Sequence, residues 1–231
     1  MPIGFRVYTK VKRAKQEYVE AFRGIPVANI ADNMGRISCV DTGIRPYTDV
    51  PLLGVAITVK VAPNDNLVFH KAIDIAQPGD IIVVDGEGSM AHSVCGDIMY
   101  SYAKKRGIAG FVVDGCIRDV DSLMTLKFPV YARGVQPKGP YKNGPGEVNV
   151  PIACGGVVVN PGDIVYGDSD GIVVIQEADA PELIKLARKH VESEEAIFKG
   201  IKDGTLNRDW VENTLTSNGG EIIDDYYPGC K

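Results

Sequence analysis

The middle of the chain alternates between helical and strand patterns, and this alternation is the feature that most constrains the fold. Residues 97–106 have a helical pattern that ends at Gly107, and residues 108–115 (IAGFVVDG) are typical of a buried strand. A second helix is predicted over 120–127 and a further strand over 128–134. Because strands separated by single helices are joined by right-handed parallel crossovers, the sequence predicts an α/β fold.

The segments on either side of this unit add helices and strands to the same domain. In chain order they are predicted to be a surface helix over 9–22, a short helix over 27–34, a strand over 54–62, a helix over 66–76, a strand over 78–86, a long loop over 135–149, short β segments with a hairpin loop at 168–171, and a long helix over 181–201. No linker interrupts the chain, so we expect a single domain over 1–231, with its core over about 25–200 and a C-terminal arm over 202–231.

Charge and composition exclude several classes of protein. The chain carries 25 basic and 30 acidic side chains, whereas nucleic-acid-binding proteins usually have a basic surplus, so no nucleic-acid partner is expected. The longest nearly apolar stretch, 150–159, is too short for a membrane span, which needs about 20 residues. Residues 1–15 lack the apolar core of a secretory signal, and the five cysteines lack disulfide or zinc spacing. We therefore expect a cytoplasmic protein with free thiols and no membrane partner.

The start of the helix predicted over 97–106 has the chemistry of an anion-binding site. Gly96 and Asp97 begin it, and the backbone N–H groups of Ile98 and Met99 in its first turn have no acceptor within the helix. Such N–H groups attract anions, and the helix dipole strengthens the attraction. A small anion is therefore expected to bind here.

The end of the following strand adds an arginine and a second carboxylate. The strand runs back toward the helix start and leads to Arg118 and Asp119, at the edge where open α/β sheets bind ligands. Arg118 can hold a carboxylate through two parallel hydrogen bonds, and Asp119 offers the hard oxygen that Mg²⁺ or Mn²⁺ prefers. Asp97 could hold a water bound to that metal. Together these groups suit a small 2-oxo acid, with its carboxylate on Arg118 and its keto oxygen on the metal. The alternative is that these residues have structural roles. Arg118 and Asp119 would then form an ion pair in a surface turn, and Asp97 would cap the helix that it begins.

The surrounding sequence resembles the RraA-like family, which includes class II pyruvate aldolases that act on 4-hydroxy-4-methyl-2-oxoglutarate and 4-carboxy-4-hydroxy-2-oxoadipate. The family's aldolases carry an Asp, twenty residues and then Arg-Asp, and this pattern matches Asp97, residues 98–117 and Arg118-Asp119. The resemblance spans roughly residues 25–200 and is carried by RGIAGFVVDGCIRDVDSL (106–123), FPVYARG (128–134), VNVPIACGGVVVNPGD (148–163) and GDSDGIVVI (167–175). It implies a three-layer β/β/α fold like the swivelling phosphohistidine domain, assembled as a homotrimer or as a hexamer made of two trimers.

The resemblance also implies roles for the residues at the proposed site. Arg118 and the backbone of residues 96–99 would bind the pyruvyl carboxylate. Asp119 would bind a divalent metal directly, Mg²⁺ or Mn²⁺, and Asp97 would orient a water on that metal. The metal would polarise the 2-keto oxygen, and cleavage of the C3–C4 bond would leave a pyruvate enolate that the metal and Arg118 stabilise.

Three further residues match functional positions of the family. Glu194 would contribute to the metal site from a neighbouring subunit, and His70 and Asp32 would lie near the distal end of the substrate. Each also has a structural interpretation, His70 as a helix residue bonded to backbone and the two carboxylates as solvated helix faces.

The activity implied is a metal-dependent aldolase that cleaves a 4-hydroxy-2-oxo acid to pyruvate and a second oxo acid, with oxaloacetate decarboxylation as a side activity. Two other functions remain open: a regulator that binds and inhibits a ribonuclease, and a related metal-dependent lyase for a sugar acid. A Schiff-base lysine, for which Lys60 is the strand-borne candidate, and a cysteine nucleophile at Cys95 or Cys116 are weaker alternatives. The loop 135–147, His92 and the arm have no clear match in the family, which leaves the substrate open.

Overall fold

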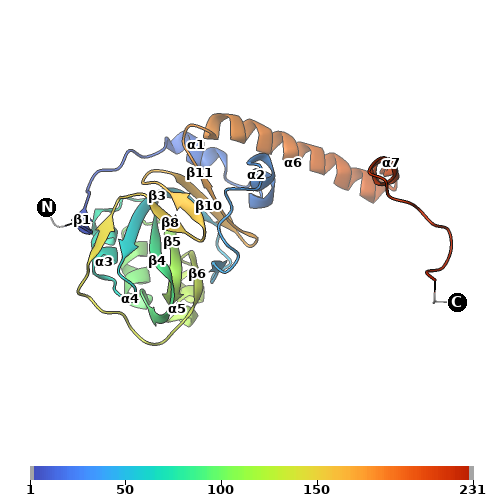
Figure 1. Cartoon of the computed structure of the whole chain (residues 1–231). Helices are drawn as coiled ribbons and strands as arrows, with labels where there is room; N and C mark the ends of the chain where they lie inside the picture. Colours follow the sequence, from blue (N-terminus) through green and yellow to red (C-terminus); the bar gives the residue numbers. More distant parts are fainter. Residues whose placement is uncertain (1–2, 229–231) are drawn as a thin grey trace. The chain divides into compact units, whose positions relative to one another are not determined.

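The computed structural model describes residues 3–228, and the chain divides into two compact units, residues 1–188 and 189–231. The first unit contains β1 (Phe5–Val7), α1 (Gln16–Ala21), α2 (Val27–Asn33), β2 (Arg45–Pro46), β3 (Leu52–Val61), α3 (Leu67–Ile75), β4 (Asp80–Ser93), α4 (Asp97–Lys105), β5 (Gly110–Ile117), α5 (Val120–Leu126), β6 (Val130–Val135), β7 (Gly146–Val148), β8 (Ile152–Cys154), β9 (Val157–Val159), β10 (Ile164–Asp168) and β11 (Gly171–Ile175) (Figure 1). Helix α6 (Ala180–Asp203) begins in the first unit and ends in the second, which also contains α7 (Asp209–Ser217).

One nine-stranded sheet organises the first unit. Its strands follow the order β1-β7-β3-β4-β5-β6-β2, while β10 pairs with β3 and β11 pairs with β10. The four central strands β3, β4, β5 and β6 are parallel, and α3, α4 and α5 connect them in turn. The parallel crossovers predicted from the alternating pattern are therefore present.

Both faces of the sheet are covered, which gives the expected β/β/α layers. On one face α3, α4 and α5 pack over the central strands, with Phe69, Tyr100 and Phe111 in the same buried cluster. On the other face, strands β8 to β11 pack against a second cluster that includes Ile81 and Val112. All eight residues of β5 are buried, as expected for a parallel strand between two layers.

A buried ion pair links the sheet to the second β layer. Asp114, near the end of β5, is buried and accepts hydrogen bonds from the Arg133 side chain of β6 and from the Gly155 N–H (2.7 Å). Arg133 also pairs with Asp41 at 2.9 Å. Because a buried carboxylate is tolerated only when it is paired, these contacts fix β5, β6 and the β8–β9 turn relative to one another.

The helix predicted over 9–22 is wrong over most of its length, because α1 covers only Gln16–Ala21. Residues 8–15 are irregular, and Arg13 donates two hydrogen bonds to Asp80, at 2.9 and 2.8 Å. Ala14 N–H donates to the Gly162 carbonyl. These long-range contacts hold the segment against the sheet and outweigh its local helical pattern.

Three other segments differ from the predicted elements. The strand predicted over 78–86 is longer in the structure, where β4 continues to Ser93. The pairing of β4 with β5 is irregular after Asp85 and again after Ser89, but the two strands remain paired as far as Ser93. Strand β7 lies inside the predicted loop, and α7 lies in the arm, where no helix is predicted. Within residues 3–228 no helix is long and apolar enough to cross a membrane. The four cysteines in that range are free, while Cys230 lies outside the described residues.

Candidate active site

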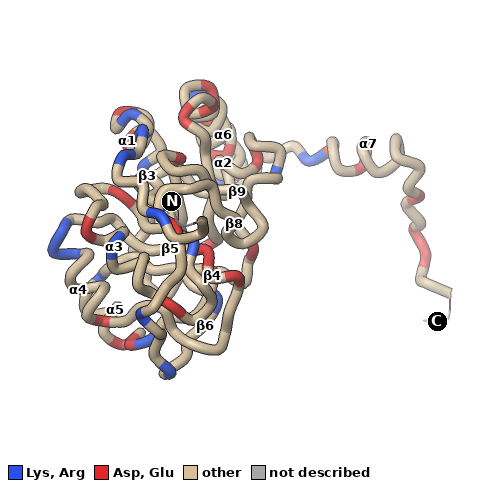
Figure 2. The backbone as a smooth tube through the Cα atoms, turned by 60° about the vertical axis from the view of Figure 1, so that its left-hand side comes forward, with Lys and Arg blue, Asp and Glu red and all other residues tan. Residues whose placement is uncertain are grey.

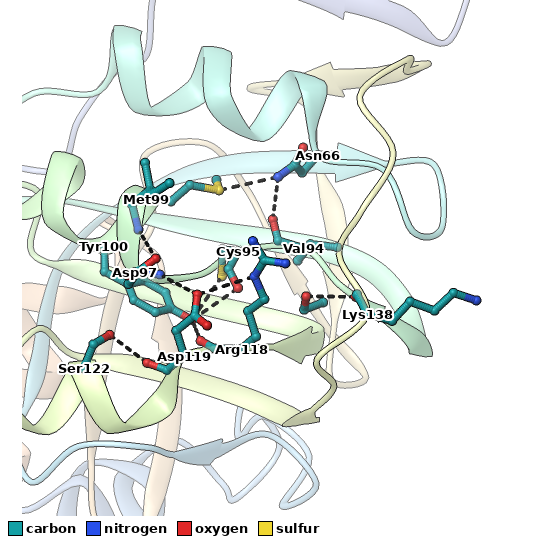
Figure 3. A network of polar contacts seen from close by, with 12 residues as sticks. Asn66, Val94, Cys95, Asp97, Met99, Tyr100, Arg118, Asp119, Ser122 and Lys138 are labelled. Atoms are coloured by element: carbon teal, nitrogen blue, oxygen red, sulfur yellow. Dashed lines mark hydrogen bonds and ion pairs between the residues drawn. The ribbon is translucent and has the colours of Figure 1, made fainter.

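The start of α4 and the end of β5 meet, as the sequence predicts, and backbone contacts hold them together. The Arg118 N–H donates to the Cys95 carbonyl (3.0 Å), and the Tyr100 hydroxyl donates to the Arg118 carbonyl (2.9 Å). Tyr100 belongs to the first turns of α4, so the peptide groups on both sides of Arg118 are tied to that helix start (Figure 3). Burial raises the pKa of Tyr100, which keeps its hydroxyl a neutral donor.

Asp97 and Asp119 come together at this junction. Asp119 precedes α5 with a left-handed backbone (φ 57°), and its side chain makes no capping hydrogen bond to that helix. Its Oδ2 instead accepts the Asp97 N–H (3.2 Å) and lies 3.4 Å from Arg118 Nε. Asp119 therefore does not cap α5, and its contact with Arg118 is the ion pair that the structural alternative expects. A left-handed backbone costs aspartate less than most residues with a side chain.

The expectation that Ile98 and Met99 offer free N–H groups to an anion is wrong in this structure. The Ile98 N–H donates to the Asp97 carboxylate (2.8 Å), and the Met99 N–H donates to the Gly96 carbonyl (3.0 Å). The cause is local, because the short Asp97 side chain reaches the next N–H group and Gly96 lies at the cap position of the helix. The positive charge that would attract an anion to this place comes mainly from the Arg118 side chain.

Gly96 allows the two segments to approach each other. A Cβ atom at this position would overlap Asp119 Oδ2 and would lie 3.0 Å from Arg118 Cγ and 3.1 Å from Arg118 Nε. The backbone of Gly96 is extended (φ −158°), a conformation that any residue adopts. Glycine is therefore required here by space and not by backbone conformation.

A cavity of about 90 Å³ opens beside this junction. Its lining contains the predicted residues His70, Gly96, Asp97, Ile98, Met99 and Arg118, and it adds Asn66, Cys95, Pro140 and Lys142. Asn66 and Lys142 are polar residues that sequence reasoning missed, because they come from the start of α3 and from a loop far along the chain. The only sequence signal for them is the length of that loop.

The loop between β6 and β7 closes the cavity and is fixed by contacts outside itself. The Asn66 N–H donates to the Tyr141 carbonyl (3.0 Å), and the Asn143 N–H donates to the Asp65 carboxylate (2.6 Å). The Tyr141 ring packs edge-on against His92, with 5.3 Å between ring centroids. His92 is buried against this loop and is not part of the cavity lining.

Two cations and one carboxylate line the cavity, namely Arg118, Lys142 and Asp97. His70 is half-buried beside them. Burial lowers the pKa of His70, and the charge of Lys142 lowers it further, so the imidazole is neutral at pH 7. A neutral imidazole both donates and accepts hydrogen bonds. The arrangement suits an anionic ligand that carries hydroxyl or carbonyl groups.

Three of the predicted residues are not part of the cavity lining. Asp119 is one of them, although it contacts the lining residues Asp97 and Arg118. Asp32 lies on α2 and pairs with Arg36 at 2.9 Å. Glu194 lies on the part of α6 that belongs to the second unit, where its Oε1 is 3.7 Å from His190 Nε2. The role expected for Glu194 requires a neighbouring subunit, so it stays a prediction.

The alternative nucleophiles lack the surroundings they would need. Burial raises the pKa of Cys95 to about 12 and also raises that of Cys116, so both thiols are protonated at pH 7. Lys60 is exposed on β3 and is not part of the cavity lining. Lys142 lines the cavity but is exposed, without the desolvation that activates a Schiff-base lysine.

The available ligands fit a hard divalent cation held by few protein groups. Across residues 3–228, no three His, Cys, Asp or Glu side chains are grouped so as to hold a metal ion. Mg²⁺ characteristically keeps several waters and binds through one or two carboxylates. The Asp119 side chain is 38% exposed and lies next to Asp97, so both carboxylates retain lone pairs for an ion or its waters. The set fits Mg²⁺ or Mn²⁺ and does not fit a structural zinc site.

Known proteins with similar sequences support the resemblance on which these expectations were based. The profile of the RraA-like family, described as Aldolase/RraA, matches residues 27–174. A relative from Halalkalibacterium halodurans, provisionally named 4-hydroxy-4-methyl-2-oxoglutarate aldolase, is 38% identical over 197 residues. That match covers 85% of this chain and 94% of the relative.

Two crystal structures have the same fold. An uncharacterised protein from Pseudomonas syringae superposes with a TM-score of 0.76 at 27% identity, over 84% of this chain and 96% of the other. RraAS2 from Streptomyces coelicolor, described as an unusual member of the RNase ES inhibitor RraA protein family, superposes with a TM-score of 0.74 at 30% identity, over 80% of this chain and 98% of the other. The profile covers most of the sheet and the whole Gly96–Asp119 junction, and on this evidence the chain belongs to the RraA-like family.

Proposed function

We propose that this protein is a divalent-metal-dependent aldolase that cleaves a 4-hydroxy-2-oxo acid to pyruvate and a second oxo acid. The observation that carries the proposal is the meeting of Asp97, Arg118 and Asp119 around Gly96, beside a cavity that Arg118 and Lys142 line. The name of the Halalkalibacterium halodurans relative supports the same reaction class. Oxaloacetate decarboxylation is expected as a side activity, because loss of CO₂ develops the same negative charge on the pyruvyl fragment.

In this proposal the chain's own residues bind and orient the pyruvyl half of the substrate. Arg118 offers parallel N–H donors to the carboxylate, and its backbone is held in place through Cys95 and Tyr100. The guanidinium also stabilises the negative charge that develops when the C3–C4 bond breaks, without reorganising. A divalent cation held by Asp119, with Asp97 on one of its waters, would supply Lewis-acid polarisation of the keto oxygen.

The residues of the distal side act on the other half of the substrate. The neutral His70 imidazole is suited to accept a hydrogen bond from the C4 hydroxyl, the group that must lose its proton when the bond breaks. The proposal also includes a contribution of Glu194 from a neighbouring subunit, and thus a homotrimer or hexamer as the active assembly.

The proposal is tested by measuring pyruvate release, coupled to NADH oxidation by lactate dehydrogenase. The substrates are 4-hydroxy-4-methyl-2-oxoglutarate, 4-carboxy-4-hydroxy-2-oxoadipate and oxaloacetate, each with Mg²⁺, with Mn²⁺ and with EDTA. We expect metal-dependent turnover that is lost in Asp119→Ala and retained in Asp121→Ala, which removes an exposed carboxylate from the first turn of α5. Turnover that survives both EDTA and Asp119→Ala would overturn the metal-dependent mechanism.

A ribonuclease-binding regulator is the second candidate, and the description of the Streptomyces coelicolor neighbour favours it. Such a regulator needs a surface but no cavity chemistry. Pull-down of an endoribonuclease by both the wild-type protein and Asp119→Ala, together with no turnover of any substrate, would favour this function over the aldolase.

A further inference from the structure

Two sulfur atoms lie in contact where the neighbouring strands β4, β5 and β6 end. The Cys116 thiol donates a hydrogen bond to the Met90 thioether, with 3.4 Å between the two sulfur atoms. Cys116 is fully buried, whereas Met90 is 51% exposed. Neither residue is part of the cavity lining. The Met90 side chain thus lies between a buried thiol and solvent.

An irregular segment of β4 positions this methionine. Residues 90–92 bulge from the ladder with β5, because Ser89 and Ser93 pair with successive residues of that strand. Gly134 of β6 leaves room for the side chain, since a Cβ atom there would overlap Met90 Cε and lie 3.5 Å from both sulfur atoms. Met90 therefore packs closely on two neighbouring strands while half of its surface faces water.

Peroxide should react with the exposed thioether before it reacts with the thiol beneath. A thiol reacts as its thiolate, and burial raises the pKa of Cys116. The segments around the two sulfur atoms, 88–94, 115–117 and 134–137, carry no Lys, Arg, Asp or Glu and are tan in Figure 2. These segments therefore supply no lysine or arginine that would favour a thiolate. A thioether needs no deprotonation, so its exposure to the oxidant decides whether it reacts.

We propose that Met90 is a site of reversible oxidation by peroxide, and that its sulfoxide uncovers Cys116. In the reaction a lone pair of the thioether sulfur forms an S–O bond as the O–O bond of hydrogen peroxide breaks. The departing hydroxide takes the remaining proton and becomes water, so the sulfur is oxidised and the peroxide is reduced. The sulfoxide is polar and favours water over its apolar contact with Gly134 and the thiol. This inference does not depend on the proposed aldolase activity, because the two sulfur atoms lie outside the cavity lining.

The oxidised side chain would lie next to parts of the chain that hold the cavity. The backbone N–H and the hydroxyl of Ser93 both donate to the Lys138 carbonyl, at 2.8 and 3.0 Å, and so hold the loop between β6 and β7. Cys116 precedes Arg118 by two residues on the chain. Reductases return methionine sulfoxide to methionine, so the mark beside the candidate site is reversible.

Two measurements on the full-length protein test the proposal, namely mass-spectrometric mapping of sulfoxides and N-ethylmaleimide labelling of each cysteine. Met124 on α5 is the control for exposure, because it is 55% exposed. Cys39 is exposed and calibrates the reagent, while Cys154 is buried and reports general unfolding. After dilute hydrogen peroxide we expect sulfoxide at both Met90 and Met124. Labelling of Cys116 should become about ten-fold faster, as loss of about half of a methionine's apolar burial predicts.

Variants separate the cover from the oxidant. Met90→Leu keeps an apolar cover that peroxide does not oxidise, so its Cys116 should stay protected after treatment. Met90→Gln is polar like the sulfoxide and should leave Cys116 open to labelling without peroxide. Met124→Leu is the matched control and should behave as wild type. Methionine sulfoxide reductases supplied with dithiothreitol should restore the protection of Cys116 in the oxidised wild-type protein.

Three results would overturn the proposal. The first is an unoxidised Met90 in protein whose Met124 has been converted to sulfoxide. The second is a Met90 sulfoxide beside a Cys116 that is labelled no faster than in untreated protein. The third is labelling of Cys154 together with Cys116, which would mean that peroxide unfolds the protein instead of removing a local cover.

Discussion

Replacing Gly96 with alanine should damage the site while sparing the fold. The new Cβ would overlap Asp119 Oδ2 and press on Arg118 at 3.0 and 3.1 Å. To restore ordinary contact distances of about 3.5–4.0 Å, the Asp119 carboxylate must move by roughly 1 Å. Misplacement by 1 Å costs about 100-fold in rate when catalysis depends on position, which corresponds to about 2.7 kcal/mol of transition-state stabilisation.

The stability of the Gly96→Ala variant should change much less. Alanine adopts the extended backbone of residue 96 without strain, and the loss of glycine at a helix cap position costs about 1 kcal/mol or less. The measurements are kcat/KM for pyruvate release and the free energy of unfolding in urea. Gly115→Ala is the control, because a Cβ there meets nothing closer than the Ser89 carbonyl at 3.4 Å. Wild-type kcat/KM in Gly96→Ala, beside an inactive Asp119→Ala, would refute the positional reasoning.

Four further predictions follow from the same structure. Asp119→Asn should keep the melting temperature within a few degrees, since asparagine tolerates the left-handed backbone, while Mg²⁺-dependent pyruvate release falls at least 100-fold. Asp114→Asn should lower the free energy of unfolding by about 3 kcal/mol in urea titrations, because it leaves the Arg133 guanidinium without its buried partner; no measurable loss would contradict the assigned ion pair. The pKa of His70 is lowered in the folded state, so protonation of His70 favours the unfolded chain. The contribution of neutral His70 to the free energy of unfolding is therefore complete above the unfolded pKa of about 6.5, and it is lost as the pH falls through the folded pKa. Lys142→Gln should raise the pKa of His70 in an NMR titration, and an unchanged pKa would mean that the Lys142 charge does not reach the imidazole.

The elements that the sequence predicts well are those set by local pattern. The alternation over 97–134 places α4, β5, α5 and β6 within a few residues of their observed bounds, because each strand is buried on both faces and each helix ends at a local signal. The juxtaposition of Asp97 with Arg118 and Asp119 follows from the crossover between α4 and β5. Family resemblance supplies their chemical roles, which the spacing alone left open.

The features that escaped prediction depend on contacts between distant residues. Arg13 draws its segment away from a helix by pairing with Asp80. Lys142 reaches the cavity only because the loop that carries it is anchored to α3, through contacts such as that between Asn66 and Tyr141. The hydrogen bond from the Ile98 N–H to the Asp97 carboxylate depends on the rotamer of Asp97, and a pattern of residue types does not specify a rotamer.

The way Asp119 is held has an evolutionary consequence. Its carboxylate makes no cap to α5, and its partners are the Asp97 N–H and the Arg118 side chain, groups at the cavity and not in the core. A lineage can therefore lose this aspartate by drift while the layered scaffold survives selection for other uses of its surface. Because the site can be lost without loss of the fold, one family can contain both proteins named as aldolases and proteins named as ribonuclease inhibitors.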